Sequence, residues 1–144
     1  MTSHDAPDTE AAGRALDSWL GIARPVEAIG AALESALGEH HAICLTAYEI
    51  MRLLSDDGGW TPLAEVCRAV DRSQPRISRL VTQMQDEGLV DRARVDGDGR
   101  AFRIRLTPRG REVHAAASVT LVEVLDRAAR EDSPVTRLLG ARTA

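Results

Sequence analysis

The chain has 144 residues, of which 44% are hydrophobic and 28% are charged. This composition is typical of a folded globular protein and argues against a disordered chain. The two cysteines, Cys44 and Cys67, are too few for a disulfide scaffold. No apolar run approaches the roughly 18 residues of a membrane span, and the polar, acidic N-terminus does not resemble a secretory signal. We therefore expect a cytoplasmic protein without a membrane partner.

The formal net charge of −4 is unevenly distributed along the chain. Residues 1–67 carry a net charge of −8, residues 68–111 carry +5, and residues 112–144 carry −1. All 18 basic residues are arginines, and eleven of them fall within residues 68–111, which we call the basic block. An acidic protein is on average a poor ligand for nucleic acid, but a basic block within acidic flanks is compatible with a DNA partner.

The N-terminal part of the chain predicts a flexible tail over residues 1–8 and a long helix over residues 9–38. Apolar residues recur at helical spacing from Leu16 to Leu37, and Gly38 is expected to end the helix. Because Pro25 lies inside this run, the sequence also predicts a kink or a break near Arg24.

Three shorter helices are predicted next. Thr46 and Glu49 fit a capping box at the start of the first of them. The Thr61-Pro62 pair predicts the N-cap and first residue of a helix that runs to about Val70. Ser73 is expected to cap a helix over residues 74–87. The buried stripe of this last helix is predicted to contain Ile77, Leu80, Val81 and Met84.

The hydrophobic period then changes from helical to alternating, which indicates strands over residues 89–95 and 102–106. The residues Asp96 to Gly99 form the expected turn between them. Arg103 and Arg105 alternate with apolar residues, so the outward face of the second strand should be cationic. The Thr107-Pro108 pair predicts another helix start, with a long helix to about Arg130 and a short one over residues 133–139.

This order of elements predicts a mainly α fold with a small β-wing. We expect a winged helix-turn-helix domain at residues 39–107, with its wing at residues 89–107, between long helices at residues 9–38 and 108–144. The second helix of such a unit lies in the major groove of DNA with its N-terminal residues at the base edges. Arginine suits guanine and glutamine suits adenine, while the hairpin arginines suit phosphates or a narrow minor groove. The candidate DNA contacts are Ser73, Gln74, Pro75, Arg76, Ser78, Arg79, Arg103 and Arg105, with Arg72, Arg92 and Arg94 as further candidates.

Three segments resemble the MarR family of transcriptional regulators. Residues 78–90 are similar to the family's recognition-helix pattern. Asp98-Gly99-Arg100, followed by Leu106-Thr107-Pro108-Arg109-Gly110, is similar to its wing signature. Residues 45–51 resemble the start of its second helix, and the likeness covers about residues 14–130.

The resemblance implies an obligate homodimer in which residues 10–38 and 108–139 of two chains interlock. The two recognition helices would then read half-sites about one helical turn apart on a near-palindromic operator. By the same resemblance, Arg100 enters the minor groove and Asp98 helps to fix the wing. Some members of the family bind small aromatic or phenolic effectors, and others use a redox-sensing cysteine. The corresponding candidates are Trp19, His41, Tyr48, Arg14 and Arg111 for the effector, and Cys44 for redox sensing.

No catalytic motif or phosphate-cradling glycine loop is present, so we do not expect an enzyme. The segment from His40 to Cys44 lacks a further ligand at metal-binding spacing, and neither a metal nor a cofactor is predicted. The sequence therefore predicts a DNA-binding repressor that an effector releases by shifting the population of its conformations. Two alternatives remain open: a winged-helix protein-interaction module without an operator, and a thiol-based redox regulator. Ordinary packing is the alternative role for Trp19, Tyr48 and Cys44.

Overall fold

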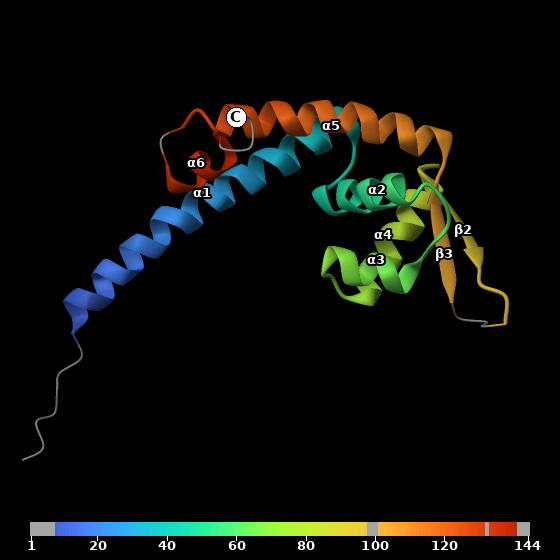
Figure 1. The fold of residues 1–144 in the computed structure, drawn as a ribbon, viewed down its shortest axis with the longest axis horizontal. Helices are drawn as coiled ribbons and strands as arrows, with labels where there is room; N and C mark the ends of the chain where they lie inside the picture. The colour runs from blue at the N-terminus through green and yellow to red at the C-terminus, as the bar shows by residue number, and fades with distance from the viewer. Residues whose placement is uncertain (1–7, 98–100, 132, 141–144) are drawn as a thin grey trace, which may run out of the picture. The chain divides into compact units, whose positions relative to one another are not determined.

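The computed structural model describes residues 8–97, 101–131 and 133–140 (Figure 1). The chain divides into two compact units. The winged unit comprises Glu34–Leu121, and the arm unit comprises Met1–Leu33 together with Val122–Ala144. Along the chain the elements are α1 (Thr9–His41), α2 (Leu45–Asp57), β1 (Thr61–Pro62), α3 (Leu63–Val70), α4 (Gln74–Asp86), β2 (Val90–Arg94), β3 (Phe102–Leu106), α5 (Pro108–Ala128) and α6 (Pro134–Gly140).

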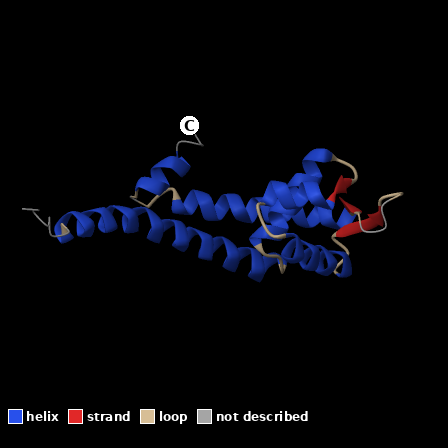
Figure 2. Cartoon of the chain, turned by 90° about the horizontal axis from the view of Figure 1, so that it is seen from below, coloured by secondary structure: helices blue, strands red, loops and turns tan. Residues whose placement is uncertain are grey.

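The core of the winged unit is aliphatic, as the low aromatic content requires. Helices α2, α3 and α4 each bury one apolar stripe, and the inner face of the sheet closes the core. Figure 2 shows the strands of this unit gathered together, with helices forming the rest of it. The predicted mainly α fold with a small β-wing is therefore confirmed. The fully buried side chains include Ile50, Met51, Val66, Ile77, Val81, Met84 and Ile104.

The sheet has three antiparallel strands in the order β1-β3-β2. Cross-strand pairs put Val90 opposite Leu106 and Arg92 opposite Ile104, so these residues share the inner face. Asp91 pairs with Arg105 on the outer face. Paired residues of an antiparallel ladder lie on the same side of the sheet, so the register assigns every wing side chain to one face.

Strand β1 was not expected from the sequence. The Thr61-Pro62 pair was predicted to start a helix, but Thr61 pairs with Ile104 and α3 begins only at Leu63. The Thr61 side chain is 1% exposed, and its hydroxyl donates to Asp57 Oδ2 at 3.1 Å instead of capping α3. Two residues are too few to show an alternating pattern, so the tertiary pairing prevails over the local signal.

Two predicted helix ends are wrong. Helix α1 runs without interruption through Pro25 and past Gly38 to His41, so the expected break is absent and the end lies three residues later. Ala42 takes the left-handed conformation (φ 55°) in place of the expected glycine, and its N–H donates to the Gly38 carbonyl at 3.1 Å. Fully buried Leu37 shows why the helix continues, because its last turns belong to the core of the winged unit.

Helix α2 begins one residue before the predicted capping box. Cys44 is the N-cap, and its Sγ accepts the N–H of Ala47 at 3.4 Å. Thr46 therefore lies inside the helix and caps nothing, which makes the predicted capping box wrong.

The start of α5 is confirmed as predicted, with Thr107 as its cap. The Thr107 hydroxyl accepts the N–H of Gly110 at 2.9 Å and donates to the Gly88 carbonyl at 2.6 Å. The Thr107 N–H donates to the Leu89 carbonyl at 3.1 Å. One residue thus ties the end of β3 to the segment between α4 and β2, and fixes where α5 begins.

The arm unit contains the larger part of α1, the end of α5 and α6. Leu33, Val124 and Ala128 are buried in it, and Ser133 Oγ accepts the N–H of Thr136 at 3.1 Å to start α6. Four large apolar side chains of α1 are exposed to solvent. None of the helices in the described part of the chain is long and apolar enough to cross a membrane. The exposed apolar residues of α1 are Leu16, Trp19, Ile22 and Val26.

Candidate nucleic-acid interface

Helix α4 separates its residues into a buried and an exposed side. Ile77, Val81 and Met84 are buried against the core, which fixes the rotation of the helix about its axis. The residues predicted to read DNA lie at its N-terminal end, and all of them except half-buried Ser78 are exposed. These residues are Ser73, Gln74, Pro75, Arg76, Ser78 and Arg79.

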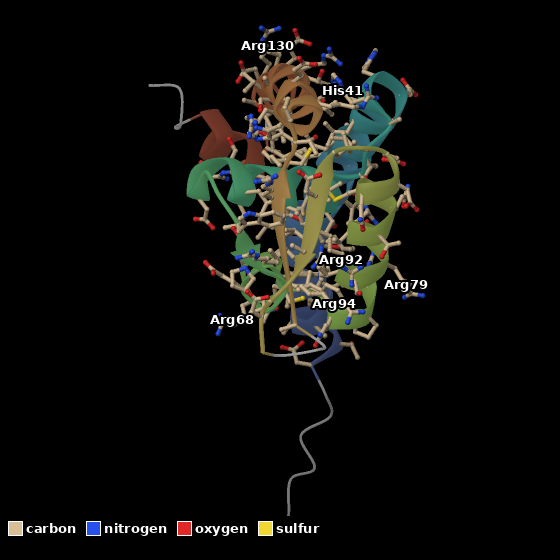
Figure 3. All side chains as sticks on the ribbon, turned by 90° about the vertical axis from the view of Figure 1, so that its right-hand side faces the viewer. His41, Arg68, Arg79, Arg92, Arg94 and Arg130 are labelled. Carbon is tan, nitrogen blue, oxygen red and sulfur yellow. The ribbon has the colours of Figure 1, made fainter. Side chains whose placement is uncertain are left out.

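The cations of α4 have no partner within the described part of the chain. Neither Arg76 nor Arg79 makes a hydrogen bond or ion pair there, and Figure 3 shows Arg79 pointing away from the helix. Ser73 is the N-cap, but its side chain makes no capping hydrogen bond. The N-terminus of a helix has unpaired N–H groups and a positive dipole end, which favour an anion such as a phosphate. This end of α4 therefore offers donors and positive charge together.

The outer face of the wing is cationic, as predicted, but its arginines are already held. Arg103 and Arg105 lie over the ring of Trp60, with guanidinium carbons 5.0 Å and 4.4 Å from the ring centroid. Arg105 Nε also donates to Asp91 Oδ2 at 3.2 Å. Trp60 was not identified from the sequence. Because it directly precedes β1, the unexpected strand is what brings its ring beside β3.

Arg92 lies on the inner face of the sheet, between β2 and α4. Its guanidinium carbon is 3.7 Å from the centre of the Phe102 ring, and its Nη1 donates to Thr82 Oγ1 at 3.3 Å. Its Nε is buried without a hydrogen-bond partner among the described residues. Arg94 shares this face, with its guanidinium 6.0 Å from the same ring. The contacts of Arg92 join the wing to the recognition helix and occupy the group that a phosphate would need.

Two candidate DNA contacts from the wing tip, Asp98 and Arg100, lie outside the described residues. They stay predictions. Arg72 is described, and its Nη1 donates to the Asp71 carbonyl at 3.2 Å in the turn before α4.

The structure distributes the five effector candidates over three places. Tyr48 and His41 join α5 from two different helices: Tyr48 Oη lies 2.9 Å from Ser118 Oγ, and His41 Nε2 lies 2.7 Å from Thr120 Oγ1. Arg111 lines a separate hollow beside Trp60. Trp19 and Arg14 belong to the arm unit, where Arg14 lies 3.6 Å from Glu10 in an exposed ion pair.

Tyr48 also packs on His114, with ring centroids 5.2 Å apart. His114 Nε2 is buried without a hydrogen-bond partner among the described residues. Burial lowers the pKa of His114, an effect that Arg52 strengthens and Asp56 opposes. A neutral imidazole with an unpaired nitrogen beside a phenol is a polar spot in an otherwise apolar core, and sequence reasoning did not identify it.

The cysteines have local structural roles. Cys44 is half-buried as the cap of α2, and Cys67 is half-buried on α3. Burial raises the pKa of the Cys67 thiol, which keeps it protonated and unreactive. Redox sensing by Cys44 stays a prediction. Among the described residues, no group of His, Cys, Asp or Glu side chains is arranged to hold a metal ion.

Comparison with known proteins gives one family. The model of the MarR family matches residues 43–101, which cover α2 to the start of the second wing strand. A solved structure of AbsC, a MarR family transcriptional regulator from Streptomyces coelicolor, is 24% identical, covers 85% of this chain and 80% of that chain, and has a TM-score of 0.71.

Two further solved structures are similar. Sco3205, a MarR family transcriptional regulator from Streptomyces coelicolor in complex with DNA, is 18% identical, covers 88% of this chain and 81% of that chain, and has a TM-score of 0.73. BpsR from Bordetella bronchiseptica, whose DNA binding is regulated by 6-hydroxynicotinic acid, is 15% identical, covers 85% of this chain and 91% of that chain, and has a TM-score of 0.68. At these identities the structural likeness shows the shared fold.

Proposed function

The chain carries a winged domain of the MarR family of transcriptional regulators, and we propose that it is a homodimeric repressor that binds a near-palindromic operator. Its relatives are regulators of transcription rather than enzymes. In this proposal α4 enters the major groove, and the wing follows the neighbouring phosphates.

One observation carries the DNA-binding proposal: the exposed end of α4 presents Gln74, Arg76 and Arg79 without intramolecular partners. A long cationic side chain that is neither buried nor paired can turn to a base edge without first losing another contact. Each good bidentate contact to a base is worth about 1–3 kcal/mol of discrimination. The arginines that hold the wing together do not have this freedom. We therefore assign base reading to α4 and phosphate contact to the outer face of the wing.

The experiment is a fluorescence-anisotropy titration with the DNA upstream of the protein's own gene and with a scrambled duplex of equal length. Arg76→Ala should weaken operator binding about five- to hundredfold and reduce the preference over scrambled DNA. Arg130→Ala is the matched control, because it removes an equally exposed positive charge at the end of α5. Operator and scrambled DNA binding equally well to the unmodified protein would overturn the proposal.

The homodimer is supported by the apolar surface of α1. Leu16, Trp19, Ile22 and Val26 are between 46% and 63% exposed and recur every three or four residues along one helix. A contiguous apolar stripe of this size on a soluble helix indicates a surface that a partner covers. A second copy of the chain presents the same stripe and can cover it by two-fold symmetry. Sedimentation should show a dimer at micromolar concentration, which Leu16→Glu with Val26→Glu converts to monomer; a monomeric unmodified protein would sink this part of the proposal.

Release from the operator is the last part of the proposed function. We propose that a small aromatic or phenolic effector stabilises an arrangement of the two recognition helices that does not fit the operator. The residues available for it in the winged unit are Tyr48, His41 and Arg111, and in the arm unit Trp19 and Arg14. A panel of small phenols and aromatic acids, added to the preformed protein–operator complex, tests this part. If no compound changes the operator affinity, the protein represses without an effector of this class.

A further inference from the structure

A hollow of about 470 Å³ opens on the outer face of the sheet, within the winged unit. Its lining comes from the end of α2, the loop before β1, the strands β2 and β3, and the first turns of α5. This volume is within the range of small-molecule pockets in proteins. The residues that give it its chemistry are Trp60, Asp91, Arg105 and Arg111.

The hollow combines one flat apolar surface with two positive charges. The ring of Trp60 is half-buried, and the guanidinium of Arg105 lies 4.4 Å from its centroid. Arg111 is exposed on α5, and its one hydrogen bond to a described residue is a long one, from Nη1 to the Leu106 carbonyl at 3.5 Å. Most donors of both guanidinium groups are therefore available. A planar fork of N–H donors matches a carboxylate, and the adjacent indole matches a flat ring.

The protein already places a carboxylate in this site. Asp91 Oδ2 accepts a hydrogen bond from Arg105 Nε at 3.2 Å, and both side chains are about half exposed, at 50% and 49%. An ion pair this exposed contributes only about 0–1 kcal/mol. A ligand carboxylate that reaches Arg105 and Arg111 together can therefore displace Asp91 at small cost.

We propose that this hollow is a binding site for a small planar aromatic carboxylate, and that its occupation weakens DNA binding. The ring would stack on Trp60, and the carboxylate would lie between Arg105 and Arg111. Arg105 also belongs to the cationic outer face of the wing, so one guanidinium cannot serve the ligand and a DNA phosphate at once. This inference rests on the proposed function, because it assigns one effector class and one site to the regulator.

The first experiment measures the ligand alone, with benzoate and indole-3-carboxylate as probes and benzamide as the neutral analogue, by titration calorimetry on the full chain. Benzoate should bind measurably at about 10 mM or below, and benzamide should not. Arg111→Gln should weaken binding about ten- to hundredfold, the loss expected for a charge-assisted hydrogen bond. Arg109→Gln is the matched control, since Arg109 is equally exposed on the same turn but does not line the hollow.

Asp91→Asn provides the opposite sign. It removes the competing charge, so benzoate should bind about two- to fivefold more tightly. A purely structural role for Asp91 would not predict this gain. Tyr48→Phe should leave benzoate affinity unchanged. Failure of both carboxylates to bind, equal affinity in Arg111→Gln, or loss of binding in Tyr48→Phe would each overturn the proposed site.

The second experiment measures DNA affinity against salt concentration, with and without saturating benzoate. Loss of one phosphate contact per protomer should lower the slope of log affinity against log salt by about 0.9 for each protomer bound. An unchanged slope and affinity would overturn the coupling. Operator binding without benzoate binding refutes only this site. Benzoate binding without operator preference refutes the proposed function and leaves the site as a ligand pocket of another kind of protein.

Discussion

Gly110 lies in the first turn of α5, at a point where a methyl group has no room. A Cβ at this position would lie 2.1 Å from the Leu89 carbonyl oxygen and 2.9 Å from Leu106 Cδ2. A tolerable C···O contact is about 3.3 Å, so the backbone of Leu89 or of α5 would have to move by about 1 Å. That shift would also strain the hydrogen bonds of Thr107 to Gly88 and Gly110. Overpacking costs about 1–3 kcal/mol and a strained hydrogen bond about 1 kcal/mol, so Gly110→Ala should lower the free energy of unfolding by about 3 kcal/mol or more.

The matched control is Gly38→Ala, because Gly38 is also helical but nothing lies within 4 Å of its Cβ position. This change should stabilise the protein by about 0.5–1 kcal/mol, since alanine loses less backbone freedom than glycine in a helix. Urea unfolding followed by circular dichroism, at one fixed protein concentration, measures both free energies. Opposite signs are expected, with a fall in Tm of about 9 °C or more for Gly110→Ala. If Gly110→Ala unfolds at the same urea concentration as the unmodified protein, the close approach of Leu89 is not rigid and the reasoning fails.

Three further predictions concern the joints of the winged unit. Arg92→Met should destabilise the fold by about 1–2 kcal/mol through loss of the Phe102 and Thr82 contacts, and weaken operator binding without changing its salt slope; a slope reduced by about 0.9 would instead make Arg92 a phosphate contact. Because the pKa of His114 is lowered in the folded state, the unfolded state binds more protons below about pH 6.5, so stability should fall as the pH drops from 7 toward 5. His114→Gln should flatten that dependence in urea titrations at several pH values, and an equally steep dependence in the variant would assign it to other groups. Thr107→Val should cost about 1–3 kcal/mol, because it removes the cap of α5 and leaves the Gly110 N–H without its acceptor; a loss below about 0.5 kcal/mol would show that water replaces it.

Periodicity predicted the helices of the winged unit because each buries one continuous stripe. It failed where a local signal competes with tertiary packing. Gly38 is a plausible helix end, but burial of Leu37 in the core favours continuing α1 to His41. Thr46 with Glu49 satisfies the pattern of a capping box, yet Cys44 caps the helix. Local patterns indicate that a helix exists better than they indicate where it ends.

The candidate site could be predicted in part. The exposed reading face of α4 follows from its buried stripe alone. The alternation of Val90, Arg92 and Arg94 held the signal that both arginines face inward, because residues two apart on a strand share a side. The role of Trp60 had no such signal. Its position beside Arg105 depends on a two-residue strand pairing with a segment some forty residues away, which no local pattern specifies.

The contacts of the basic block sharpen the argument from charge. Its net charge of +5 suggested a uniformly cationic reading surface. Several of its arginines instead stabilise the wing: Arg92 lies on Phe102, Arg103 lies on Trp60, and Arg105 pairs with Asp91. Arginines with protein partners define the shape of the wing, and those without partners on α4 are the ones that can discriminate between sequences. Substitution of the first group should therefore change stability and affinity for all DNA together, whereas substitution of the second should change the ratio between operator and random DNA.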